Sequence, residues 1–171
     1  MTKRLLIVLA ALVATPISAS AQEPLVQSLR GLFDVTKGVV MATAQDLDAT
    51  MYAYRPSDEV RSAGQILAHI ADGQFIFCSA AAGEANPHPE SVEQTTTAKA
   101  AIIQALQQGF AYCERVFDRT TDRGAARVVQ FFNGPNTTGG VLAFNSAHNY
   151  EHYGNLVTYM RINGIVPPSS R

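Results

Sequence analysis

The chain has 171 residues, 13 of them basic and 14 acidic, and its length suits one domain. The basic residues are scattered along the chain, whereas a nucleic-acid-binding protein clusters them to neutralise phosphates. We therefore expect a single domain that does not bind nucleic acid.

The first 21 residues are typical of an export signal. Lys3 and Arg4 form a positively charged end, residues 5–17 carry no charge, and Ala19-Ser20-Ala21 supplies small residues for cleavage. The uncharged stretch is shorter than the roughly 20 apolar residues that a membrane-spanning helix needs.

We expect cleavage before Gln22, which makes residues 22–171 the mature domain. Loss of two of the 13 basic residues leaves about 11 against 14 acidic ones, a net charge of about −3. The predicted location is the periplasm or the exterior of the cell, without stable membrane insertion after cleavage.

Apolar residues recur at steps of three or four through the start of the mature chain, the spacing of one helix stripe. They predict a first helix over 24–54, ended by Arg55-Pro56 because proline disfavours helical geometry in the residue before it. Ser57 or Asp58 is expected to cap a second helix that runs to 82. The stripe of the first helix consists of Leu25, Leu29, Leu32, Phe33, Val40, Leu47, Met51 and Tyr54.

The rest of the chain predicts two more helices and two long connections. Residues 83–97 are polar and contain two prolines, which indicates a loop, and a helix follows over 98–120. A second connection covers 122–140. The last helix is expected over 141–163, because Gly164 suits the left-handed position that follows a helix.

Four amphipathic helices without an alternating strand pattern predict an all-α four-helix bundle. The loop over 83–97 is longer than an antiparallel hairpin requires. At about 3.3 Å per residue it could span about 50 Å, enough to return along a helix. We therefore expect the second and third helices to be parallel and joined by a long crossover.

Three of the four histidines occupy core-facing, mid-helix positions. His148 and His152 are four residues apart, so they leave one helix face about one turn apart, and His69 faces inward on the second helix. Three neutral imidazoles predict a divalent metal site with an open coordination position, as in catalytic zinc sites. The alternative is a set of hydrogen-bonded core histidines without metal. His88 lies in the loop and is expected to be solvated.

Two segments of the chain resemble the DinB family of damage-inducible helical metalloproteins. They are Arg61–Ala71, which contains the first histidine, and residues 148–168, which contain the spaced pair. The resemblance covers essentially all of the mature chain. It implies an up-down-down-up bundle, a divalent ion such as zinc or nickel on His69, His148 and His152, and frequent homodimers.

The resemblance leaves the reaction and the catalytic residues open. Members with known activity include thiol-dependent transferases and a thiol-dependent isomerase, but this chain has an export signal and low-molecular-weight thiols are chiefly intracellular. We predict a metal-dependent hydrolase or transferase acting on an unidentified small molecule. The alternative is a non-catalytic metal-binding or stress-associated bundle.

A metal-activated water would need a general base, because such a group removes its proton. The nearest carboxylates in sequence are Asp72 and Glu151, and both placements favour a surface or supporting role over catalysis. Tyr153 and residues 127–133 are candidates for the border of the pocket.

Cys78 and Cys113 each lie late in a predicted helix. If those helices are parallel, the two residues have similar heights, and disulfides persist outside the cytoplasm. We expect a bridge between them. Two buried free thiols are the alternative.

Overall fold

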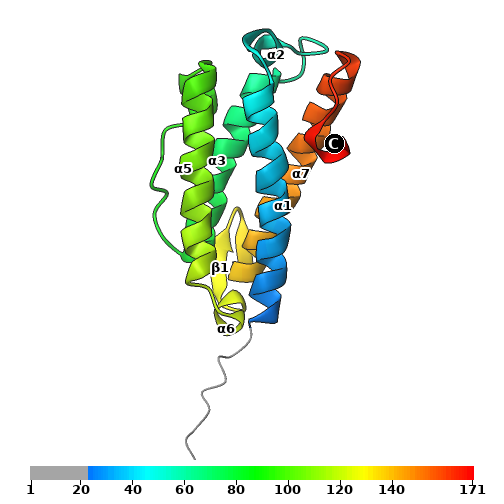
Figure 1. Cartoon of the computed structure of the whole chain (residues 1–171). Helices are drawn as coiled ribbons and strands as arrows, with labels where there is room; N and C mark the ends of the chain where they lie inside the picture. The colour runs from blue at the N-terminus through cyan, green and yellow to red at the C-terminus, as the bar shows by residue number, and fades with distance from the viewer. Residues whose placement is uncertain (1–22) are drawn as a thin grey trace, which may run out of the picture.

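The computed structural model describes residues 23–171, so the predicted export signal lies outside the described residues. Four long helices lie side by side and form the body of the molecule (Figure 1). They are α1 (Pro24–Asp46), α3 (Ala63–Ala82), α5 (Lys99–Asp118) and α7 (Thr138–Ile162).

Short elements connect the long helices, and the protein is predominantly helical. The short helices are α2 (Ala49–Ala53), α4 (Val92–Thr95), α6 (Asp122–Ala125) and a 3-10 turn, η1 (Pro168–Ser170), and a hairpin is formed by β1 (Val128–Phe131) and β2 (Gly134–Thr137). Within residues 23–171, no helix has the length and apolar character needed to cross a membrane.

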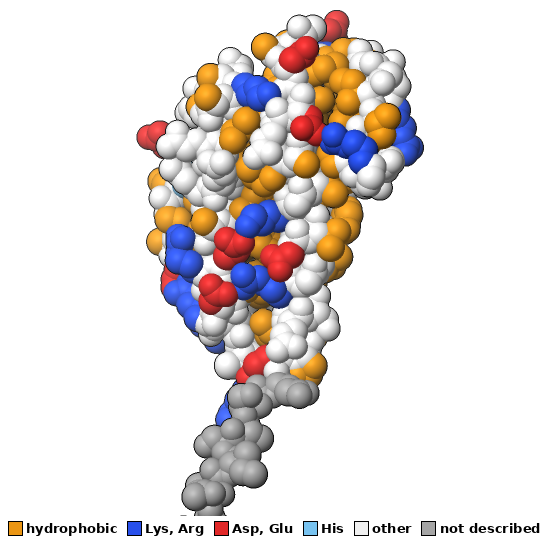
Figure 2. All heavy atoms as spheres, in the orientation of Figure 1, with side chains coloured by type: hydrophobic (Ala, Val, Ile, Leu, Met, Phe, Trp, Pro, Cys, Tyr) orange, Lys and Arg blue, Asp and Glu red, His pale blue; other side chains and the backbone are white. Residues whose placement is uncertain are grey.

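Contacts at the two ends of α1 and α5 show that these helices run in opposite directions. Lys99, at the start of α5, donates to the carbonyl of Gln45 at the end of α1, with a distance of 2.8 Å. Arg30, near the start of α1, pairs with Asp118 at the end of α5 at 2.6 Å. Acidic and basic side chains are interleaved over these two helices (Figure 2).

A disulfide links α3 to α5. Cys78 and Cys113 are bridged, with 5.3 Å between their Cα atoms, which confirms the predicted pair. About one turn earlier Gly109 packs against Gln74, with the same offset along the chain, so α3 and α5 run in the same direction. A bridge that closes a loop of this size stabilises a fold by about 2–4 kcal/mol.

The first helix is shorter than the sequence predicts. The prediction of one helix over 24–54 is wrong, because Leu47 adopts an extended conformation after Asp46. Asp48 then starts α2, and its carboxylate accepts a hydrogen bond from the amide of Met51. An aspartate cap of this kind satisfies a free helix amide and lets a new helix begin within the same apolar stripe.

The second long helix starts later than predicted. Ser62, rather than Ser57 or Asp58, is its N-cap. The Ser62 hydroxyl accepts from the amide of Gln65, and the Gln65 side chain accepts from the amide of Ser62. This reciprocal capping box satisfies two amides, which makes it a stronger start than a single cap.

The second connection contains the hairpin and α6, so the expectation of no strands is wrong. Val128 pairs with Thr137 and Phe131 with Gly134 across four-residue strands that are too short to show clear alternation. The last helix starts at Thr138 rather than at 141, because the Thr137 hydroxyl caps it by accepting from the amide of Gly140.

Candidate metal centre

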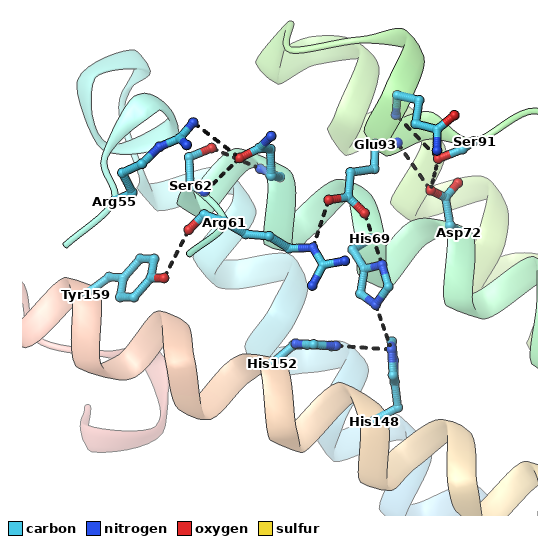
Figure 3. Close-up of polar contacts among 12 residues, drawn as sticks. Arg55, Arg61, Ser62, His69, Asp72, Ser91, Glu93, His148, His152 and Tyr159 are labelled. Atoms are coloured by element: carbon cyan, nitrogen blue, oxygen red, sulfur yellow. Dashed lines mark hydrogen bonds and ion pairs between the residues drawn. The ribbon is translucent and has the colours of Figure 1, made fainter. Parts of the chain in front are cut away.

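Three histidines from two helices meet at one point. His69 projects from α3, and His148 and His152 project from α7 (Figure 3). The Nε2 atom of His148 lies 3.2 Å from that of His69 and 3.1 Å from that of His152. One ring nitrogen from each lies within 4.8 Å of the others, so the group could hold a metal ion. The structure thus brings together the three predicted ligands.

The nitrogen separations fit a shared ion. Two nitrogens that each lie about 2.0–2.1 Å from a tetrahedral zinc are about 3.3 Å apart. His148 Nε2 faces both of the other Nε2 atoms, and a neutral nitrogen carries either one proton or one lone pair for these two contacts. A cation between three lone pairs satisfies all of them at once.

Burial keeps the two α7 histidines neutral. His148 is 9% exposed and His152 is 8% exposed. Burial lowers the pKa of His148 to about 3, with smaller contributions from the neighbouring His152 and His69. Burial also lowers the pKa of His152. Neutral imidazole is the form that binds metal, so the site is ready to bind at neutral pH.

Close packing of α3 on α7 brings the histidines together. Gly73 lies one turn after His69, and a Cβ atom at this position would lie 2.9 Å from Cε1 of His148. A larger residue would therefore displace the His148 ring. Glycine at 73 allows the ring of a candidate ligand to rest directly against the α3 backbone.

A carboxylate orients His69. Glu93 Oε2 lies 3.1 Å from Nδ1 of His69, and its other oxygen accepts from Nε of Arg61 at 2.7 Å (Figure 3). An acceptor at Nδ1 favours the tautomer that carries its proton there, which leaves the lone pair of Nε2 free for a metal. Glu93 therefore acts through His69 and supports the site from outside.

Asp72 holds the segment that carries Glu93. Its carboxylate accepts from the amides of Val92 and Glu93 at 2.7 and 3.1 Å, and from the Ser91 hydroxyl at 2.8 Å. These contacts fasten α4 to α3 and place Glu93 beside His69. The other predicted carboxylate, Glu151, is exposed on α7.

A pocket of about 490 Å³ opens beside the histidines. His69 and His148 line it, and of the segment 127–133 Phe132 contributes to it. Tyr153 packs elsewhere, because its hydroxyl bonds to Ser169 in the C-terminal turn. The other lining residues are Arg61, Asp72, Gly73, Ile76, Phe77, Asn86, His88, Pro89, Glu90, Ser91, Glu93, Gln94 and Phe144.

His88 is less solvated than the sequence suggests. Its ring stacks on Phe75 with 5.0 Å between centroids, and its Nδ1 lies 2.7 Å from the carbonyl of Glu90. It is absent from the group of converging nitrogens in the described residues. A second hollow of about 550 Å³ adjoins His152, and Arg61 and Glu93 line both spaces.

The sequence matches a model of the DinB superfamily over residues 32–156. The chain belongs to this superfamily. No curated protein matches it. Two solved structures of the same type are similar, a DinB-like protein from Bacillus cereus and another from Bacillus subtilis.

The DinB-like proteins share the fold at low sequence identity. The B. cereus protein is 16% identical with a TM-score of 0.72, over 83% of this chain and 95% of that one. The B. subtilis protein is 21% identical with a TM-score of 0.64, over 80% and 92%. A mycothiol-dependent maleylpyruvate isomerase is 16% identical with a TM-score of 0.63, over 77% of this chain and 60% of the isomerase.

Proposed function

We propose that this protein is a metal-dependent hydrolase or transferase that holds one divalent ion, zinc or nickel, on His69, His148 and His152. The main support is the convergence of three Nε2 atoms beside a pocket. That of His148 lies 3.2 Å from that of His69 and 3.1 Å from that of His152. No carboxylate or thiol among residues 23–171 joins this group as a fourth ligand. Three protein ligands with a free position are typical of catalytic zinc sites.

The chain would position the metal ligands and provide a pocket beside them. A divalent ion would act as a Lewis acid that polarises a substrate or activates water. Glu93 keeps His69 oriented, and Gly73 lets His148 approach α3. We further infer that the four long helices follow an up-down-down-up order, which sets α3 and α7 side by side with opposite directions.

The second candidate is a metal-binding bundle without catalysis. The observation in its favour concerns the nearby carboxylates. Glu93 is engaged by His69 and Arg61, Asp72 is engaged by the α4 segment, and Glu151 is exposed. No carboxylate in the described residues is both free and directed at the three nitrogens, so a general base is not evident.

Elemental analysis after mild purification tests the metal site. We expect about one divalent ion per chain, and replacement of His69, His148 or His152 by Ala should weaken binding at least about tenfold, because each supplies one of three ligands. His88→Ala is the matched control and should keep the ion. Wild-type protein without stoichiometric metal would contradict the proposal, as would retention of the ion by a triple alanine variant.

We also propose that the protein works outside the cytoplasm. The charged, uncharged and small-residue pattern of the first 21 residues supports this, and the Cys78–Cys113 disulfide is the kind of bond that oxidising compartments preserve. N-terminal sequencing of the protein from its native host should start at Gln22 or a neighbour. A cytoplasmic chain that retains Met1 would rule out export.

A further inference from the structure

The pocket beside the histidines has one aromatic wall. Phe77 on α3, Phe144 on α7 and Phe132 in the hairpin turn form it, with ring centroids 5.2–6.1 Å apart and interplanar angles of 78–88°. The wall reaches a candidate ligand directly, because the Phe77 ring lies 4.9 Å from the ring of His148. The aromatic wall and the metal centre thus belong to one continuous space.

The backbone at Phe132 is unusual for a phenylalanine. Phe131 pairs with Gly134, so Phe132 and Asn133 form a two-residue hairpin loop. Phe132 has a φ of 50°, and it is the non-glycine residue with positive φ in the described chain. When only the first residue of a two-residue hairpin loop has a positive φ, that residue is normally glycine. Phenylalanine at this position retains an unfavourable backbone conformation.

The Phe132 ring contacts neighbouring aromatic rings but remains largely exposed. The residue is 69% exposed, so most of its apolar surface stays in water. Phe144 in the same wall is 40% exposed. Strained backbone conformations and exposed apolar side chains in a cavity both occur at ligand-binding sites. These two features coincide on one residue that lines the pocket next to the histidines.

We propose that Phe132, with Phe77 and Phe144, forms a subsite for the aryl group of a small-molecule substrate. The metal-binding end of that substrate would reach the ion on the histidine side of the pocket, which His69 and His148 line. This inference rests on the proposed function, which supplies the ion. A volume of about 490 Å³ is within the usual range of small-molecule sites. Rings set edge to face present both hydrogen edges and π faces, which favours an aromatic group over an alkyl group of similar size.

The pocket also has polar lining residues, which can orient such a ligand. They include Asn86, His88 and Glu93. Polar groups at a few positions in a largely apolar cavity fix the orientation of a ligand. Phe132 is therefore a specificity-determining residue, and the chemistry takes place at the histidine end.

Two hydroxamates with the same metal-binding group provide the test. Zinc-loaded protein is titrated by calorimetry with benzohydroxamate and with acetohydroxamate. Wild type should bind the phenyl compound about ten times more tightly, because the ring is removed from water against the aromatic wall. Phe132→Gly should reduce this ratio to near one while keeping the fold, since glycine adopts positive φ freely.

Two further variants complete the test. Val128→Ala, on the same hairpin at a position 67% exposed, should keep the wild-type ratio. Phe144→Leu keeps an apolar side chain on α7 and should also lower the ratio. Equal binding of the two compounds by wild type, or an unchanged ratio in Phe132→Gly, would overturn the subsite while leaving the metal site intact. Failure of zinc-loaded protein to bind either compound would overturn the open coordination position and the subsite together.

Discussion

Gly73 connects the packing of the helices to the position of one candidate ligand. The residue has no side chain that could hold α7 away, and the ring of His148 occupies the space where a Cβ atom would lie. The His148 ring therefore packs directly against the backbone of α3. His69 lies on that same helix, one turn before Gly73. A single methyl group at this position tests whether the close approach matters for metal binding.

We predict that Gly73→Ala weakens zinc binding by about ten- to a hundredfold, the range found when the support of a metal ligand is disturbed. The added methyl would lie 2.9 Å from Cε1 of His148, so the ring must move. A competition titration with a chromogenic chelator measures the affinity. Gly154→Ala is the matched control, because it lies on α7 two residues after His152 with no atom within 4 Å of an added Cβ.

The control should bind zinc like wild type. Its free energy of unfolding should stay equal or rise by about 0.5–1 kcal/mol, because alanine is the better helix former. If Gly73→Ala and Gly154→Ala retained the same zinc affinity, the close approach of α3 to His148 would be irrelevant to the site.

The candidate ligands could be predicted from the sequence, whereas the support of His69 by Glu93 could not. A four-residue step places His148 and His152 on one helix face by helix geometry alone. Glu93 comes from the connection between α3 and α5, and no local spacing relates it to His69. Its position depends on three hydrogen bonds to Asp72, which exist only after the chain has folded.

At the scale of elements, the apolar pattern identified the four long helices but misjudged part of the buried face of α1. Leu25 and Leu32 are 51% and 42% exposed, whereas Thr36 and Thr43 are fully buried. The Thr36 hydroxyl donates to the carbonyl of Phe33, and that of Thr43 to a carbonyl one turn before it. Internal hydrogen bonds let threonine enter the core, and a pattern based on hydropathy does not detect them.

Helix α7 also buries polar residues that a hydropathy pattern does not detect. Asn145 and Asn149 are fully buried, and both bond to Gln74 of α3, at 3.0 and 2.7 Å. Asn145 also lies 3.3 Å from each sulfur of the Cys78–Cys113 bridge. A buried hydrogen-bond network of this kind can form in only one relative position of the two helices, so it stabilises that position over others. It therefore helps to hold the register in which His69 meets the pair on α7.

At the scale of the whole molecule, the candidate metal site joins the two halves of the chain. Its ligands come from α3 and α7, and the disulfide joins α3 to α5 in the interior close by. An ion that binds the folded chain and not the unfolded one adds its binding free energy to the stability. Metal removal should therefore show how stable the bundle is with the imidazoles of His148 and His152 buried and uncoordinated.

Protonation of the two buried imidazoles, His148 and His152, should destabilise the metal-free protein in mild acid. Burial holds the pKa of folded His148 at about 3, far below the value of about 6.5 expected in the unfolded chain, and it lowers the pKa of His152 in the same direction. Between these values the unfolded state binds more protons than the folded state. The contribution of the neutral, buried imidazoles to the free energy of unfolding is therefore complete above about pH 6.5. It is lost as the pH falls toward 3.

Urea unfolding of chelator-treated protein at pH 7 and pH 5 measures this loss. The midpoint should fall at pH 5 in wild type, and the fall should be smaller in His148→Gln, which cannot take up the proton. His88→Gln removes a histidine outside the group of three and should show the full wild-type decrease. Because carboxylates near pH 5 affect all three proteins alike, the difference between the two variants isolates the buried imidazole. An equal decrease in wild type and in His148→Gln would show that this residue is not held neutral by the fold.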